Sequence, residues 1–305
     1  MMFGLEYQTQ KLSVAPGIEL CVTSRISPAL SPLLLLHGHP QSHVIWHRVA
    51  PELSRHFSLI MPDLRGYGDS SKPAGDPQHL AYSKRAMAQD MQALMQHFGY
   101  QHYQVLAHDR GARVAHRLAL DYPEAVTHLL LLDIAPTLAM YEQTSQQFAA
   151  LYWHWFFLIQ PAPFPETLIN ASPLTYLRRT IRAAVGQFEP QAWAEYERCI
   201  QNPETVRAMC EDYRASATID LEHDRADNVS QRRIQCPIQV LWARHGVIEQ
   251  CFDPLAEWRK LCCLPTLVSG YAVDCGHYIP EEAPQAVIEA ALKFFLSAPS
   301  AERYV

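Results

Sequence analysis

The sequence predicts an α/β protein with a mostly parallel sheet that is interrupted by a helical insertion. Two observations carry this prediction. Short apolar segments bounded by turn residues alternate with helical patterns near both ends of the chain, and an aromatic-rich, helix-patterned block from 137 to 229 separates them. A length of 305 residues suits one large core with an insertion. We therefore expect a core domain of residues 1–136 and 230–305, with a helical cap (lid) formed by residues 137–229.

The individual elements follow from apolar runs and their flanking turn residues. Strand character is expected at Glu6–Ser13, Ile18–Ser24, Leu33–His37, Phe57–Pro62, Tyr103–His108, His128–Ile134, Ile238–Ala243 and Thr266–Val273. Helices are expected at Ser83–Phe98, Gly111–Asp121 and Pro284–Phe295. Ligands of such sheets bind beyond the carboxyl ends of the strands, so an insertion that follows a strand end should cover the ligand site.

Composition excludes several classes of function. The net charge is −6, which argues against a protein that binds nucleic acid or an anionic membrane. The 8 cysteines include no CxxC pair, so neither a disulfide framework nor a zinc knuckle is expected. The N-terminal segment lacks the pattern of a secretion signal, and no apolar run is long enough to span a membrane. We expect a cytoplasmic protein without metal or cofactor.

The segment Ala107-His108-Asp109-Arg110-Gly111 lies between an apolar strand and a helix. Ala107 and Gly111, two positions before and two positions after the centre, are both small. Small residues at these positions are typical of a tight turn that lifts the central side chain out of the sheet. The central residue is Asp109. A carboxylate there can displace a leaving group from saturated carbon and form an alkyl ester. The alternative is that Asp109 only caps the following helix.

Two further residues could complete a catalytic set with Asp109. His277, in Cys275-Gly276-His277, follows the last strand, and it could activate water against the ester carbonyl. Asp133 follows the strand at His128–Ile134 and could hold the imidazole in its working tautomer. Glu249 is the rival for that role, although it lies farther from the end of its strand.

The segment His37-Gly38-His39-Pro40 follows the strand at Leu33–His37. The backbone N–H groups of His39 and Arg110 could stabilise an oxyanion during ester hydrolysis. A metal site is the alternative for the histidines of this region, His37, His39, His43 and His47. It is disfavoured because no carboxylate or cysteine joins them at ligand spacing.

Two further groups of residues could bind an anionic substrate. Arg110 and Arg113 stand beside the proposed nucleophile and could hold a carboxylate. His154, Trp155 and Tyr213 fall in the insertion, and each carries an N–H or O–H donor that could solvate a departing halide. The alternative for these aromatic residues is that they only fill the core of the cap.

Taken together, these motifs resemble the α/β-hydrolase superfamily and, more closely, the fluoroacetate (haloacetate) dehalogenases. The resemblance covers nearly the whole chain, and its specific part is Asp109-Arg110-Gly111-Ala112-Arg113 with His154-Trp155. It implies an α/β-hydrolase fold whose eight-stranded, mostly parallel sheet is flanked by helices, a helical cap, and a homodimer. It also implies that a small 2-haloacid, such as fluoroacetate or chloroacetate, is converted to glycolate and halide.

The resemblance assigns the same roles to the residues singled out above. It implies Asp109 as nucleophile, His277 as base, Asp133 as its acid partner, and Arg110 with Arg113 as the carboxylate site. It implies a halide pocket of His154, Trp155 and Tyr213. The sequence departs from this family at His39, where these dehalogenases typically carry phenylalanine, so one wall of the pocket should be more polar.

Two alternatives remain open from the sequence. An epoxide hydrolase would use the same nucleophile and base, with tyrosines such as Tyr152, Tyr176 or Tyr213 protonating the epoxide oxygen. Those enzymes usually carry tryptophan after the nucleophile, whereas this chain has Arg110, which favours an anionic substrate. A non-catalytic binding protein on the same scaffold is the second alternative, and it has no need for Asp109, Asp133 and His277 together.

Overall fold

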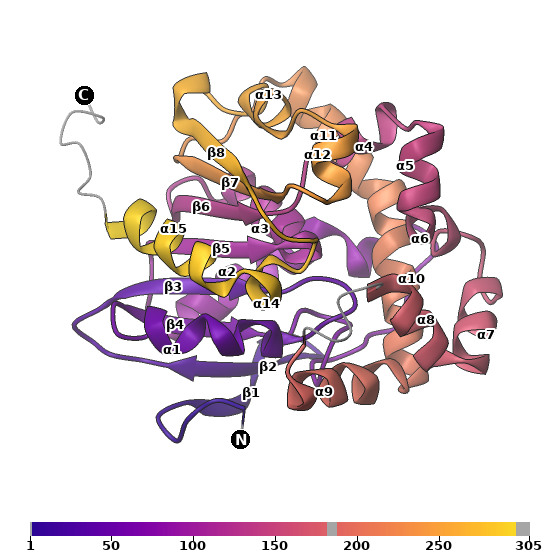
Figure 1. Ribbon diagram of the computed structural model, residues 1–305, viewed down its shortest axis with the longest axis horizontal. Coiled ribbons are helices and arrows are strands. Elements are labelled where there is room, and N and C mark those ends of the chain that lie inside the picture. Colours follow the sequence, from indigo (N-terminus) through magenta and orange to yellow (C-terminus); the bar gives the residue numbers. More distant parts are fainter. Residues whose placement is uncertain (1, 182–187, 297–305) are drawn as a thin grey trace.

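A computed structural model describes residues 2–181 and 188–296 of the chain. Its centre is one eight-stranded sheet in the order β1-β2-β4-β3-β5-β6-β7-β8 (Figure 1). The first two pairs in this order, β1 with β2 and β2 with β4, are antiparallel, and the remaining pairs are parallel. The strands are β1 Gln8–Ala15, β2 Ile18–Arg25, β3 Ser31–Leu36, β4 Phe57–Pro62, β5 Tyr103–His108, β6 Val126–Leu132, β7 Ile238–Ala243 and β8 Val268–Val273. The predicted α/β class is confirmed.

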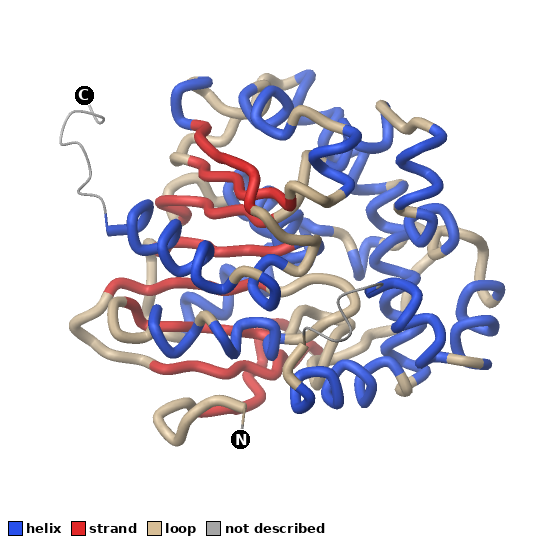
Figure 2. Tube along the Cα trace, in the orientation of Figure 1, coloured by secondary structure: helices blue, strands red, loops and turns tan. Residues whose placement is uncertain are grey.

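Alternation along the central strands places apolar side chains on both faces of the sheet. In β3, Leu33 and Leu35 belong to one core cluster, and Leu34 and Leu36 belong to the other. Helices cover both faces, as Figure 2 shows, which is why these strands read as continuous apolar runs. The helices of this core are α1 Ala50–Leu53, α2 Lys84–His97, α3 Asp109–Asp121, α12 Val247–Cys251, α13 Pro254–Arg259, α14 Ile279–Glu282 and α15 Pro284–Leu296.

The described part of the segment between β6 and β7 consists of helices joined by loops, and it contains no strand. Its helices are α4 Thr137–Glu142, α5 Gln146–Leu151, α6 Trp153–Phe157, α7 Phe164–Ala171, α8 Pro173–Ile181, α9 Pro190–Ile200, α10 Pro203–Ala217 and α11 Ile219–Val229. Figure 1 shows α5 to α10 gathered beyond one end of the strands. None of the helices in the described part of the chain has the length and apolarity needed to cross a membrane.

Candidate active site

Asp109 stands at the sharp turn between β5 and α3, with a left-handed backbone (φ +46°). The prediction that the helix starts at Gly111 is wrong by two residues, because α3 already begins at Asp109. The turn needs two glycines as close neighbours. A Cβ on Gly111 would lie 2.3 Å from the carbonyl oxygen of His37, and one on Gly38 would lie 2.5 Å from the Cβ of Asp109. The two glycines therefore leave the space that the backbone and side chain of Asp109 occupy at this turn.

His277 and Asp133 lie next to Asp109, as the sequence predicts. His277 Nδ1 is 2.6 Å from Asp133 Oδ2, and His277 Nε2 is 3.9 Å from Asp109 Oδ2. Asp133 follows β6 and accepts a second hydrogen bond (2.8 Å) from the backbone N–H of Ala243. The rival Glu249 instead accepts a hydrogen bond from Trp242 Nε1 at an exposed position.

Asp109 and His277 each stabilise the charged form of the other. Burial would raise the pKa of Asp109, but the nearby charges of His277, Arg110 and Arg113 lower it well below its ordinary value. Burial would lower the pKa of His277, but its hydrogen bond to Asp133 and the charges of Asp133 and Asp109 raise it. Asp109 is therefore ionised near neutral pH, as a nucleophilic carboxylate must be.

His39 follows β3 and faces Asp109 through its backbone and its side chain. Its backbone N–H donates to Asp109 Oδ1 at 2.9 Å, the position of an oxyanion donor once Asp109 becomes an ester. Its Nε2 lies 3.1 Å from Tyr176 Oη, and its ring stacks on that of His154 at 5.8 Å. Burial lowers the pKa of His39 to about 4, so the ring is neutral.

The other histidines after β3 have partners of their own. His37 Nε2 accepts from the backbone N–H of Leu64, and His43 Nδ1 lies 2.8 Å from Asp63 Oδ1. His47 Nδ1 lies 3.0 Å from the carbonyl oxygen of Val44. Across residues 2–181 and 188–296, no group of three or more His, Cys, Asp or Glu side chains could hold a metal ion.

The two arginines are both buried, but their partners differ. Arg110 makes a two-pronged ion pair with Asp212, at 2.8 Å for each nitrogen, and one of its terminal nitrogens, Nη1, has no hydrogen-bond partner. Arg113 donates to neutral groups, among them Thr137 Oγ1 at 2.8 Å, and no carboxylate in the described chain forms an ion pair with it. Arg113 is thus a buried cation that no carboxylate of the described chain contacts directly, although the charge of Asp109 acts on it. A buried cation without a directly bound carboxylate favours an anionic ligand.

Aromatic rings of the cap cover both guanidinium groups. The ring of Tyr213 lies 4.1 Å from the Arg110 guanidinium carbon, and the ring of Trp155 lies 4.6 Å from that of Arg113. Tyr213 Oη and Trp155 Nε1 are buried and have no hydrogen-bond partner in the described structure. Unpartnered donors from two arginines, a tyrosine and a tryptophan therefore lie in one region.

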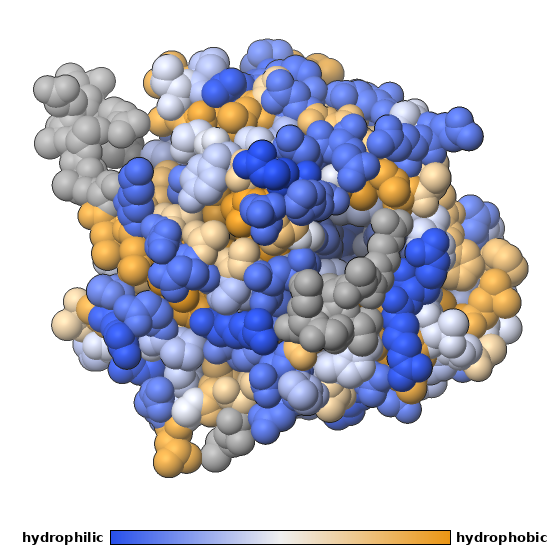
Figure 3. Space-filling model, viewed as in Figure 1, coloured by the Kyte–Doolittle hydropathy of each residue, from blue (hydrophilic) through white to orange (hydrophobic). Residues whose placement is uncertain are grey.

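A cavity of about 260 Å³ lies in front of Asp109 and His277. Of the residues expected to bind substrate, His39, His154 and Tyr213 line it, whereas Arg110, Arg113 and Trp155 do not. Tyr152, His245 and Gln250 also line this cavity. Figure 3 shows a recess in the surface to the right of its centre, on the side where Figure 1 places α8 and α12.

Sequence reasoning missed two residues that structure this site. Asp212 pairs with Arg110, and Glu282 binds the backbone on both sides of His277. Asp212 directly precedes Tyr213 in α10 and lies between the charged residues Glu211 and Arg214, so its burial has no local signal. Glu282 belongs to the pair Glu281-Glu282, which reads as an ordinary charged first turn of a helix.

Comparison with known proteins identifies a family and relatives of this chain. Residues 31–284 match the family model described as the alpha/beta hydrolase fold. The chain is 38% identical to a fluoroacetate dehalogenase from Burkholderia sp over 92% of this chain and 91% of that protein. It is 34% identical to a soluble epoxide hydrolase from Corynebacterium sp. (strain C12), over 87% and 90%.

A solved structure extends the match to the fold. It is that of a protein from Nostoc sp PCC 7120 described as an alpha/beta hydrolase, with a TM-score of 0.91, 48% identity, and coverage of 98% of this chain and 100% of that one. The family model and these full-length relatives lead to one conclusion: the chain belongs to the α/β-hydrolase family.

Proposed function

We propose that this hydrolase converts haloacetates, such as fluoroacetate and chloroacetate, to glycolate and halide through an ester of Asp109. The observation that carries the proposal is an ionised carboxylate nucleophile near Arg113, a buried cation that no carboxylate of the described chain contacts directly. The carboxylate of an anionic substrate would supply that contact. The similarity to a fluoroacetate dehalogenase supports the same assignment.

In the first half-reaction, the substrate carboxylate binds Arg113 and the free Nη1 of Arg110. Because neither guanidinium lines the cavity, the rings of Tyr213 and Trp155 must shift before the substrate carboxylate can reach the two arginines. An oxygen of Asp109 then attacks the halogen-bearing carbon from the side opposite the halogen. The new C–O bond forms as the carbon–halogen bond breaks, and the halide departs with the bonding electrons toward the donors of His154, Trp155 and Tyr213.

In the second half-reaction, water attacks the ester carbonyl carbon of Asp109. The 3.9 Å gap between His277 Nε2 and Asp109 Oδ2 leaves room for a water that His277 deprotonates, while Asp133 holds the imidazolium. The backbone N–H of His39 stabilises the oxyanion, with the N–H of Arg110 as the proposed second donor. The ester C–O bond then breaks, and glycolate leaves with the proton taken by His277. The second proton of the water passes to solvent, and Asp109 returns to an ionised carboxylate with one oxygen from water.

The decisive experiment is a single turnover with chloroacetate in oxygen-18 water, followed by mass spectrometry. We expect the label in the Asp109 side chain. Asp109→Asn should abolish halide release, and His277→Asn should release one equivalent of halide and accumulate the ester. Label found only in glycolate, or normal turnover by His277→Asn, would refute the mechanism.

Epoxide hydrolysis is the second candidate. Tyr152 and Tyr213 both line the cavity with Asp109, and hydroxyls in such positions can protonate an epoxide oxygen. The similarity to a soluble epoxide hydrolase supports this reading as well. Parallel assays with fluoroacetate, chloroacetate, bromoacetate and styrene oxide separate the two, because styrene oxide carries no charge for Arg113 to bind.

A further inference from the structure

The loop that carries His277 is held on both sides by one carboxylate. Glu282 Oε2 accepts from the backbone N–H of Gly276 at 2.6 Å, and Glu282 Oε1 accepts from the N–H of Tyr278 at 3.0 Å. Glu282 therefore spans the peptide on either side of His277. Charge-assisted hydrogen bonds of this kind are stronger than neutral ones, so this contact fixes the loop more firmly than a backbone pair would.

The rest of the loop accommodates this contact. A Cβ on Gly276 would lie 2.7 Å from Glu282 Oε2, so the glycine leaves room for the carboxylate. The carbonyl oxygen of His277 accepts from the backbone N–H of Ile279 at 3.0 Å and lies 2.9 Å from His108 Nε2. The backbone of His277 and both of its neighbours is thus fixed from α14 and from β5.

We propose that Glu282 is a positioning residue that acts through His277 in the second half-reaction. This inference rests on the proposed function, because it requires an Asp109 ester that His277 hydrolyses. In the first half-reaction His277 makes no bond to the substrate, and its Nε2 is too far from Asp109 to hydrogen-bond to it. In the second, Nε2 must orient a water toward the ester carbonyl, so loop placement limits only that step.

Glu282 also contributes to the charge around His277. The groups that face the imidazole are Asp133 after β6, His108 and Asp109 at the turn into α3, Tyr152 from the cap, the adjacent Tyr278, and Glu282 from α14. The three carboxylates of this set raise the pKa of His277 against the effect of burial. Removing the charge of Glu282 should therefore lower that pKa.

The test compares Glu282→Gln with Glu281→Gln, a matched control one residue away. The Glu281 side chain accepts from Tyr196 Oη at 2.6 Å and, within the described structure, makes no hydrogen bond to the loop of His277. Rapid-quench single turnovers with chloroacetate measure halide release and glycolate formation separately. For Glu282→Gln we expect halide release within about twofold of the native rate and glycolate formation slowed by about 10-fold or more, with the ester accumulating.

Two further measurements keep the inference falsifiable. Gly276→Ala forces the loop and the carboxylate apart without changing charge, so it should slow the same step. The acidic limb of the pH profile for glycolate formation should move to lower pH in Glu282→Gln but not in Gly276→Ala. Equal loss in both half-reactions, no loss, or the same loss in Glu281→Gln would overturn the role of Glu282. Absence of halide release by the native protein would instead overturn the proposed function.

Discussion

Two carboxylates of the site adopt a backbone conformation that costs free energy. Asp109 (φ +46°) and Asp133 (φ +50°) are both left-handed, although neither is glycine. Such residues cost about 1–3 kcal/mol each and persist only where the surroundings enforce them. Here both lie at the carboxyl ends of neighbouring strands, β5 and β6, and the strained geometry points both side chains at His277.

Gly38→Ala tests how closely the nucleophile is packed. The new Cβ would lie 2.5 Å from the Cβ of Asp109 and 2.6 Å from its Oδ1, so Asp109 must move. A displacement near 1 Å costs on the order of 10²-fold in rate, and we expect that loss in kcat for chloroacetate. Circular dichroism should show a folded protein. Native kcat in a folded Gly38→Ala variant would contradict the packing described here.

The pH dependence of turnover should report His277. Its pKa lies above the ordinary 6.5, because Asp133 and the other nearby carboxylates outweigh burial. The base must be neutral, so kcat should fall as pH drops through that raised pKa. In the ester the charge of Asp109 is gone, so Asp133 dominates the shift.

Asp133→Asn is the matched test of that pH dependence. It should move the acidic limb of kcat to lower pH and reduce kcat by about 10³–10⁴-fold, the order seen for this change in a Ser-His-Asp triad. An acidic limb at the same pH in Asp133→Asn as in the native protein would show that the limb reports a group other than His277.

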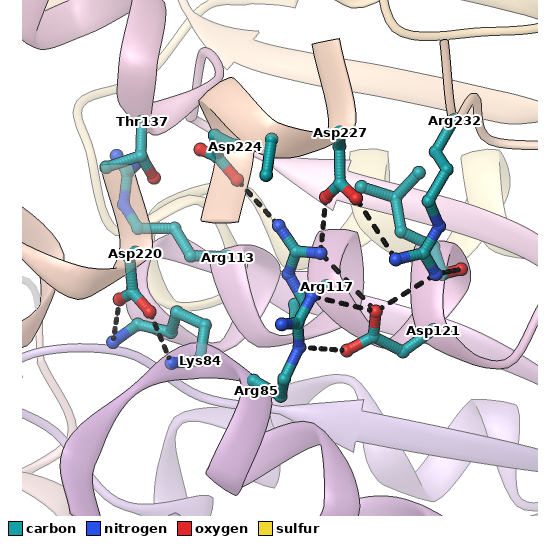
Figure 4. A network of polar contacts seen from close by, with 12 residues as sticks. Lys84, Arg85, Arg113, Arg117, Asp121, Thr137, Asp220, Asp224, Asp227 and Arg232 are labelled. Carbon is teal, nitrogen blue, oxygen red and sulfur yellow. Dashed lines mark hydrogen bonds and ion pairs between the residues drawn. The ribbon is translucent and has the colours of Figure 1, made fainter. Parts of the chain in front are cut away.

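At the scale of elements, ion pairs join the end of the cap to the core. Arg117 on α3 lies 2.8 Å from Asp224 and also pairs with Asp227, both on α11 (Figure 4). Asp227 in turn lies 3.0 Å from Arg232. Arg117 is buried, so these contacts gain from a lower effective dielectric than surface pairs have.

Arg117→Met should therefore destabilise the protein, because it leaves Asp224 without its cation. Breaking a buried ion pair from one side costs about 3–5 kcal/mol, and we expect the lower end of that range in urea unfolding. Arg178→Met is the control. Arg178 is 58% exposed and pairs with Glu197 on the surface, so its loss should cost less than about 1 kcal/mol. An equal loss of unfolding free energy in the two variants would show that burial of Arg117 does not strengthen its ion pairs.

Elements differed in how well the sequence predicted them. The bounds of β4, β5 and β7 match the prediction to the residue, because turn residues border these apolar runs on both sides. Within the cap only the helical character could be predicted. The helix ends there depend on packing, as in α6, which spans five residues between Tyr152 and Leu158. The order of the strands in the sheet could not be predicted from local sequence patterns, because tertiary contacts determine which strands pair, as for β3 and β5.

The same limit applied to the site. Asp109, Asp133 and His277 each follow a strand, and strand ends of a parallel sheet converge, so local pattern sufficed to predict their proximity. The ion pair of Arg110 with Asp212 joins residues 102 positions apart, and the sequence around neither residue indicates that they pair. The sequence therefore predicts the same role for both arginines, whereas within the described residues Arg110 has a carboxylate partner and Arg113 has none.

At the scale of the whole molecule, the proposed anionic substrate would have to enter a protein of net charge −6. Long-range attraction does not favour that encounter, so affinity has to come from local cations. The homodimer remains a prediction from the family resemblance, and sedimentation velocity at several protein concentrations tests it directly. An anion bound to Arg113 should, in contrast, raise the free energy of unfolding of each chain.

Glycolate, the proposed product, should therefore stabilise the native protein, whereas glycolamide, its uncharged counterpart of nearly equal size, should not. A ligand present at 100 times its Kd raises the free energy of unfolding by about 2.7 kcal/mol, which thermal denaturation detects as a higher Tm. Arg113→Met should remove this shift, and Arg178→Met should keep it. Equal stabilisation by glycolate and glycolamide would mean that the cavity selects shape rather than charge. Arg113 would then need another partner than a substrate carboxylate, and the assignment of an acidic substrate would fail.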